Sequence, residues 1–174
     1  MSHVGVWLKG RVSMGLQDDL DVIAKQEKAL QFESFGADTA WEVGCSLREQ
    51  AMRRAAVMTF EIQVAGRVLF HAVTHNPPAG QADWIRRKRN TVMRFGRASY
   101  AMGLQLELEK KTIEERHGLT LADYALHGGG FPIVLRGTGY VGSVVASGLT
   151  QREDHAMVVT ALGEALGTAV VGLG

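Results

Sequence analysis

A histidine followed by three glycines, His127-Gly128-Gly129-Gly130, is the first segment whose residue types suggest chemistry. Consecutive glycines reach backbone conformations that are closed to other residues and let a ligand approach the main chain. Their N–H groups can surround an anion, and we expect His127 to contact the same ligand. The spacing matches neither GxxxxGK[ST] nor GxGxxG, so a nucleotide loop is not indicated. A strained turn into the next strand would explain the glycines equally well.

A second candidate is the start of the last expected helix, the segment 147–155, which runs from Ser147 to Asp154 and His155. A helix N-terminus offers unpaired N–H groups and the positive end of the helix dipole, so it readily holds a carboxylate or a phosphate. Asp154 and His155 are adjacent and point in different directions on a helix, so they cannot orient each other. The alternative is simple capping, because Thr150 and Glu153 have the spacing of a capping box.

A basic string is the third candidate, and it runs through Trp84-Ile85-Arg86-Arg87-Lys88-Arg89-Asn90. On a helix, one face would carry Arg86, Asn90, Arg94 and Arg97. An acidic ligand, a phosphate or an acidic subunit surface could bind there, although a solvated helix face is an equally good interpretation. Nucleic acid is not expected, because there is one short basic stretch and the net charge is only +1.

Familiar catalytic patterns are absent from the sequence. HExxH and GxSxG do not occur, and the single cysteine, Cys45, has no recognisable His/Asn signature. The six histidines are scattered, and His71 and His75 fall on an expected strand and loop rather than on one helix. No side-chain metal site and no catalytic residue is therefore predicted, and whether the protein is an enzyme stays open.

Length and composition limit the classes of protein to which the chain can belong. A chain of 174 residues with 46% apolar and 21% charged residues fits one globular domain. One cysteine excludes an internal disulfide and a thiolate zinc cluster, and it fits a reducing compartment. No window approaches the ~18 apolar residues of a membrane span. We expect a soluble, cytoplasmic protein that does not enter membranes.

The expected elements begin after a short extension. Residues 1–14 are predicted to be disordered, and residues 15–174 to form one domain. Helical spacing of apolar residues predicts helices over about 16–35, 40–54, 81–110 and 112–118, with a last helix from Thr150. Alternation predicts a hairpin over 57–73, and a second hairpin is predicted over 131–145. This order favours an α+β fold with an antiparallel sheet and helices on its faces.

Four strings resemble the GlcG/HbpS-like superfamily, which is often labelled haem-degrading. They are FESFGADTAWEVG (32–44), DWIRRKRNTVMRFGRASYAMG (83–103), ADYALHGGGFPI (122–133) and VGSVVASGLTQREDHAMVV (141–159). The resemblance covers nearly everything after Met14. It implies a profilin-like three-layer αβα sandwich and a homo-oligomer in which dimers build larger rings. Thr150 stands where relatives commonly have proline, and both residues suit a helix start.

The resemblance also implies a set of ligand-binding residues. These map to Trp84, Arg86, Lys88, Arg89, Asn90, His127, Gly128, Gly129, Gly130, Asp154 and His155. Some members of the superfamily bind or degrade haem, so haem is a candidate cofactor. His127 or His155 would then be its axial ligand, and arginines would meet its propionates.

Three functions remain under consideration. The leading hypothesis is a homo-oligomeric protein with a pocket at a subunit boundary for a small anionic molecule, haem or another tetrapyrrole included. The alternative is an assembly or chaperone-adaptor protein whose basic helix docks other proteins, with no small ligand. The third is an enzyme that acts on a small metabolite, for which the sequence singles out no nucleophile or base.

Overall fold

The computed structural model describes the backbone of residues 4–173 and the side chains of residues 15–173. Along this part of the chain the elements are α1 (Val4–Ala29), β1 (Gln31–Phe32), α2 (Ala37–Arg53), β2 (Thr59–Val64), β3 (Arg67–Val73), α3 (Gly80–Phe95), α4 (Ser99–Glu109), α5 (Ile113–His117), β4 (Gly130–Leu135), β5 (Gly139–Ser147) and α6 (Gln151–Leu166). None of the helices within residues 4–173 is long and apolar enough to cross a membrane. The predicted extension over residues 1–14 lies outside the described side chains, and the division into domains stays a prediction.

The strands form one sheet in the order β1-β4-β5-β2-β3. Both expected hairpins are present, since β2 pairs antiparallel with β3 and β4 pairs antiparallel with β5. The α+β class is confirmed, but the sheet is mixed, because β1 pairs in parallel with β4. The sequence pattern placed this strand inside the first helix. Instead the chain leaves the helix after Ala29, and Phe32 packs edge-on against Phe35 with ring centroids 4.9 Å apart.

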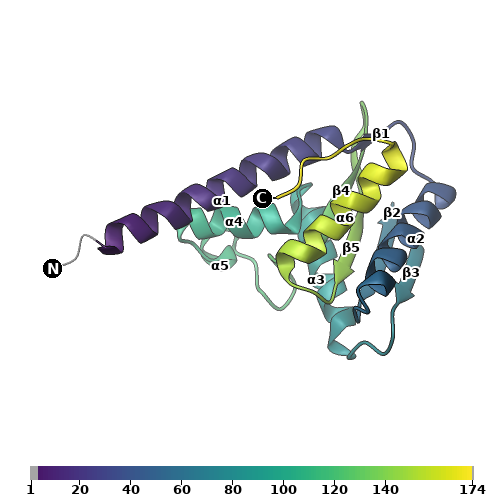
Figure 1. Cartoon of the computed structure of the whole chain (residues 1–174), viewed down its shortest axis with the longest axis horizontal. Helices are drawn as coiled ribbons and strands as arrows, with labels where there is room; N and C mark the ends of the chain where they lie inside the picture. The colour runs from purple at the N-terminus through teal and green to yellow at the C-terminus, as the bar shows by residue number, and fades with distance from the viewer. Residues whose placement is uncertain (1–3, 174) are drawn as a thin grey trace.

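The two faces of the sheet bury different kinds of side chain. Helices α2 and α6 pack together over one face (Figure 1). That face holds the apolar core, with Phe60, Phe131 and Val144 at its centre. Helix α3 packs on β4, β5 and β2, where the strands contribute the buried polar residues Glu61 and Ser143. The three layers agree with the sandwich that the family resemblance implies.

A break replaces the single long helix expected over 81–110. Helix α3 ends at Phe95, and Gly96 takes a left-handed conformation with φ 63° before α4 begins at Ser99. This conformation favours glycine, and a Cβ at Gly96 would lie 2.6 Å from the ring of Tyr140. The break therefore lets the chain change direction beside β5. By contrast, the expected capping boxes at Thr112 and Thr150 are both confirmed.

Candidate functional site

A pocket of about 350 Å³ opens between α3, the loop before β4 and the connection from β5 to α6. Its volume falls at the lower end of the range for small-molecule sites, roughly 300–1,000 Å³. The pocket is lined by Gln81, Trp84, Lys88, His127, Ser147, Gly148, Leu149, Gln151 and Asp154. All three candidate segments of the sequence therefore contribute to one cavity, although each contributes only part of its residues.

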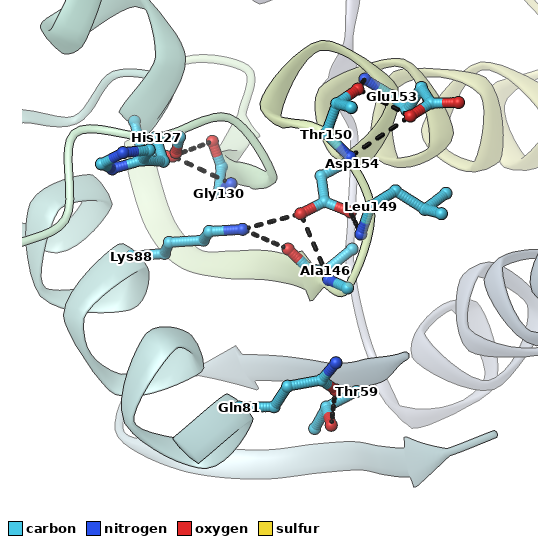
Figure 2. Close-up of polar contacts among 12 residues, drawn as sticks. Thr59, Gln81, Lys88, His127, Gly130, Ala146, Leu149, Thr150, Glu153 and Asp154 are labelled. Carbon is cyan, nitrogen blue, oxygen red and sulfur yellow. Dashed lines mark hydrogen bonds and ion pairs between the residues drawn. The ribbon is translucent and has the colours of Figure 1, made fainter. Parts of the chain in front are cut away.

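A buried ion pair lies in the wall of this pocket. The Lys88 ammonium donates to Asp154 Oδ2 and to the carbonyl oxygen of Ala146, each at 2.9 Å (Figure 2). Both charged side chains are only 2% exposed. Lys88 belongs to α3, Ala146 to β5 and Asp154 to the first turns of α6. One amine thus connects the two helix layers around the end of a central strand.

Asp154 also fixes the connection that leads into α6. Its carboxylate accepts from the backbone N–H of Leu149 at 3.0 Å and from that of Gly148 at 3.4 Å. The capping box at Thr150 and Glu153 satisfies further N–H groups of the same turn. Because both ends of this connection are hydrogen-bonded, the pocket wall formed by Gly148, Leu149 and Gln151 is held in one conformation.

Burial is the main influence on the pKa of each member of the pair. It lowers the pKa of Lys88, and the nearby Asp154 carboxylate opposes that change. It raises the pKa of Asp154, which the ammonium and the backbone N–H groups oppose. Desolvation penalises the charged form of both groups, so a proton passes between them at a lower free-energy cost than it would between the same groups in water.

The three glycines allow the chain to pass close to the pair. A Cβ at Gly128 would lie 1.8 Å from the carbonyl oxygen of Gln151. Gly129 has φ 113°, and a Cβ there would lie 2.2 Å from the Ala146 oxygen and 2.9 Å from Lys88 Nζ. The N–H of Gly130 donates to Ser99 Oγ at 3.0 Å. Close backbone packing accounts for each of these glycines.

His127 and Trp84 form the aromatic part of the lining. Their rings meet edge-to-face with centroids 4.9 Å apart, and the guanidinium of Arg87 lies 4.2 Å from the Trp84 ring centroid. The His127 ring is exposed. Partial burial and the positive charges of Lys88 and Arg87 lower its pKa. The imidazole is therefore neutral near pH 7 and has a nitrogen lone pair available to a ligand.

Comparison with known proteins now identifies the family. The family model described as "Haem degrading protein HbpS-like" matches residues 35–163. The chain belongs to the HbpS-like family. A "UPF0303 protein" of Paraburkholderia phymatum is 47% identical over 88% of this chain and 93% of the relative. Another, from Azotobacter vinelandii, is 50% identical over 86% of this chain and 90% of the relative.

Solved structures share the fold of this HbpS-like chain. The crystal structure of the Ybr137w protein superposes with a TM-score of 0.78 and 30% identity, over 85% of this chain and 88% of that one. HbpS superposes with a TM-score of 0.61 and 16% identity, over 79% of this chain and 93% of that one. The complex of PduOC with haem superposes with a TM-score of 0.66 and 14% identity, over 79% of this chain and 98% of that one. At these identities the last two comparisons bear on the fold alone.

The remaining basic residues of the HbpS-like chain lie outside the pocket lining. Arg86 donates to Asp83 at 2.9 Å and to Asp123 at 3.0 Å. Arg89 pairs with Glu61 across the α3 face of the sheet, and the Asn90 amide donates to the carbonyl oxygen of Asp123. These side chains anchor α3 to the sheet and to the loop before β4.

His155 is also outside the pocket. Its side chain is fully buried, and Nε2 lies 2.8 Å from Gln26 Oε1. Gln26 in turn donates to the carbonyl oxygen of Val171 at 2.7 Å. His155 Nδ1 has no hydrogen-bond partner among the described residues. Of the two histidines proposed from sequence as iron ligands, only His127 faces the pocket.

Five of the lining residues are not among the ligand-binding residues mapped from the sequence, namely Gln81, Ser147, Gly148, Leu149 and Gln151. All of them except Gln81 belong to the second candidate segment, residues 147–155. Gln81 is held at the pocket edge, where it accepts from Thr59 Oγ1 at 2.8 Å (Figure 2). Ser147 is only 6% exposed, and the described residues offer its hydroxyl no hydrogen-bond partner. Ser147 is the first residue of the candidate segment 147–155, and the structure adds that it lines the pocket.

Removal of one member of the buried pair is expected to destabilise the fold strongly. We expect Lys88→Met to lower the free energy of unfolding by about 3–5 kcal/mol, because Asp154 would remain buried without a partner. Lys88→Met combined with Asp154→Leu should recover most of that loss. Urea unfolding at neutral pH measures both.

Arg53→Met, in an exposed pair with Glu49 at 3.7 Å, is the control and should change stability by less than ~1 kcal/mol. Equal losses at Lys88 and Arg53 would contradict the expectation.

The buried His155 is expected to make the fold sensitive to acid. Burial lowers its pKa from 6.5 to about 4, so between these values the unfolded chain binds a proton that the folded chain does not. The contribution of this group to the free energy of unfolding is complete above pH ~6.5. It falls by ~1.4 kcal/mol for each pH unit as the pH drops toward 4. Urea unfolding across this range should show a weaker pH dependence in His155→Gln. His71→Gln, at an exposed histidine, should retain the slope of the parent, and an unchanged slope in His155→Gln would refute the assignment.

Proposed function

We propose that this HbpS-like chain is a cytoplasmic, homo-oligomeric binding protein whose pocket accepts a small anionic molecule. The observation that carries the proposal is that Lys88, His127 and the start of α6 line one cavity. An ammonium and the N-terminus of a helix both favour a negative charge. The single cysteine, Cys45, supports a reducing compartment.

Haem is the first ligand to test, for two reasons. The family description names haem degradation, and a structural neighbour was solved in complex with haem. The neutral, exposed imidazole of His127 suits an axial iron ligand, and a bound haem would supply redox chemistry at its iron. At about 350 Å³ the pocket is small, so we propose that a tetrapyrrole would extend beyond it toward a second subunit.

An exposed apolar surface supports the proposal of a homo-oligomer. Trp41 on α2 is 65% exposed and Val68 on β3 is 51% exposed, and Trp41 contacts Phe70 of β3 with ring centroids 6.0 Å apart. Strand β3 is also the last strand of the sheet. Exposed aromatic residues beside an open sheet edge are typical of protein interfaces. We refer to Trp41 and Val68 as the α2–β3 patch.

The structure gives less support to the alternative function, in which the basic helix docks other proteins. A docking surface needs charged groups that are free to meet a partner, whereas Arg86 and Arg89 already pair with Asp83, Asp123 and Glu61. Arg87 likewise bonds to Asp83 at 2.7 Å. These local partners neutralise much of the positive charge that the sequence displays.

A haemin titration tests the ligand. We expect a saturable Soret shift in the parent protein, and His127→Ala should weaken binding by at least ~10-fold, because the imidazole would no longer ligate the iron. His71→Ala, at an exposed histidine on β3, is the matched control and should leave the titration unchanged. A weak, unsaturable shift that is the same in all three proteins would eliminate haem and leave other small anions as candidates.

Substitution in the α2–β3 patch tests the assembly. Trp41→Lys should shift the protein to smaller species in analytical ultracentrifugation, because loss of a buried aromatic anchor typically costs at least ~2 kcal/mol of association free energy. Leu121→Lys is the control, since Leu121 is 57% exposed but lies in the loop before β4. An unchanged sedimentation profile for Trp41→Lys, or a monomeric parent protein, would contradict the assembly proposed through this patch.

A further inference from the structure

We propose that Lys88 captures a short carboxylate that carries an aldehyde or ketone, by forming an imine with its carbonyl carbon inside the pocket. This inference rests on the proposed function, because it uses the same cavity. It goes further by giving the ligand a chemical class and the amine a covalent role. Three features of the site support it: the position of the amine, the acid beside it and the polar groups opposite.

The first feature is the position of the Lys88 amine. Lys88 lines the cavity, and its Nζ uses two of its three possible hydrogen bonds, to Ala146 and Asp154. The neighbouring Gly129 has no side chain, and a Cβ there would lie only 2.9 Å from Nζ. The backbone at Gly129 therefore packs directly beside the amine, where no side chain would fit. Lys88 is thus both buried and part of the pocket lining, and burial favours the reactive amine because it disfavours the ammonium form.

The second feature is a proton acceptor in contact with the amine. Asp154 Oδ2 lies 2.9 Å from Lys88 Nζ, and burial raises the pKa of this carboxyl while it lowers that of the lysine. Transfer of one proton from nitrogen to oxygen converts the ion pair into a neutral amine and a neutral acid. Activation of a lysine in this way is a general route to covalent catalysis on carbonyl compounds.

The covalent step balances without an oxidant or a reductant. The amine lone pair forms a bond to the carbonyl carbon, and the carbonyl π electrons move to oxygen. One proton then passes from nitrogen to that oxygen, which gives a carbinolamine. Asp154 returns its proton to the hydroxyl group, the C–O bond breaks and water leaves as nitrogen forms the double bond. The product is a protonated imine beside an ionised Asp154.

The third feature is a site for the carboxylate end of the ligand. Gln151, the first residue of α6, lines the pocket, and N–H groups in the first turn of a helix lack intrahelical acceptors. Ser147 supplies an independent observation, because this residue is only 6% exposed and lines the same cavity, and its hydroxyl has no hydrogen-bond partner among the described residues. A hydroxyl and a helix N-terminus on one wall suit a carboxylate.

Stability alone does not account for the pair. Replacement of a buried ion pair by apolar residues of similar volume is often neutral or stabilising, so a Lys–Asp contact in the interior contributes little net stability. Nor does packing require that both residues of the pair should line a cavity. Imine chemistry explains why an amine, a carboxyl group and an unpartnered hydroxyl share one small pocket.

Borohydride trapping tests the proposal on the full-length protein. The protein is incubated with pyruvate, reduced with sodium borohydride, digested and mapped by mass spectrometry. We expect saturable modification of Lys88, with Lys110, which is exposed, modified only at background level. Lactate has the same carboxylate without the carbonyl, so it should compete with pyruvate and form no adduct. Modification spread over exposed lysines, with none enriched at Lys88, would overturn the proposal.

A conservative variant guards against a folding artefact. Ser147→Ala removes one hydroxyl and should lower trapping at Lys88 by roughly 10-fold, which corresponds to one lost hydrogen bond to a charged group. Gln63→Ala, at a partly buried polar residue of β2 that does not line the pocket, should trap as the parent does. Equal trapping by the parent and Ser147→Ala would overturn the carboxylate site.

Calorimetric titration with lactate, run in parallel, separates this proposal from the proposed function. Lactate binding without a Lys88 adduct would reject the imine and leave a non-covalent anion site. Absence of both lactate binding and the adduct would reject the imine and remove small carboxylates from the proposed ligands, while the haemin titration would still test the pocket itself.

Discussion

The contact between Lys88 and Asp154 determines how the candidate site is built. The two residues come from helices on opposite faces of the sheet, and they meet at the end of β5, where Ala146 supplies a third partner. An ion pair in the interior needs complete hydrogen bonding and close surroundings. The N–H groups of the β5–α6 connection meet the first need. The glycines before β4 meet the second, because no larger residue fits between the pair and the neighbouring backbone.

The parts of the fold that the sequence predicted correctly are those that depend on local interactions. The hairpin turn at Ala65 and Gly66 and the capping boxes at Thr112 and Thr150 each involve residues within a few positions of one another. The parts that the sequence predicted wrongly involve residues that are far apart along the chain. Strand β1 exists only because β4 lies beside it, and at Gly96 the Tyr140 ring occupies the space that a Cβ would need. The periodicity of apolar residues along the chain gives no information about either of these distant neighbours.

The candidate site was predictable in its segments but not in its geometry. The basic string contains Lys88, yet nothing in the string distinguishes the one cation that enters the interior from those that pair at the surface, such as Arg86. The same holds for Asp154 and His155, which are adjacent in sequence and are buried in different surroundings. Ser147 belongs to the second candidate segment, but only the assembled cavity shows that it lines the pocket and that its hydroxyl has no hydrogen-bond partner among the described residues.

The unequal faces of the sheet give the two helix layers different thermodynamic characters. Exposure of apolar surface raises the heat capacity of a protein, and exposure of polar surface lowers it. Separation of α2 and α6 from the sheet would expose the apolar core and carry most of the heat-capacity increment of unfolding. Detachment of α3 would expose Glu61, Ser143 and Lys88 together with fewer apolar groups. The enthalpy of detaching the layer that carries the pocket should therefore vary less with temperature than the enthalpy of detaching the opposite layer.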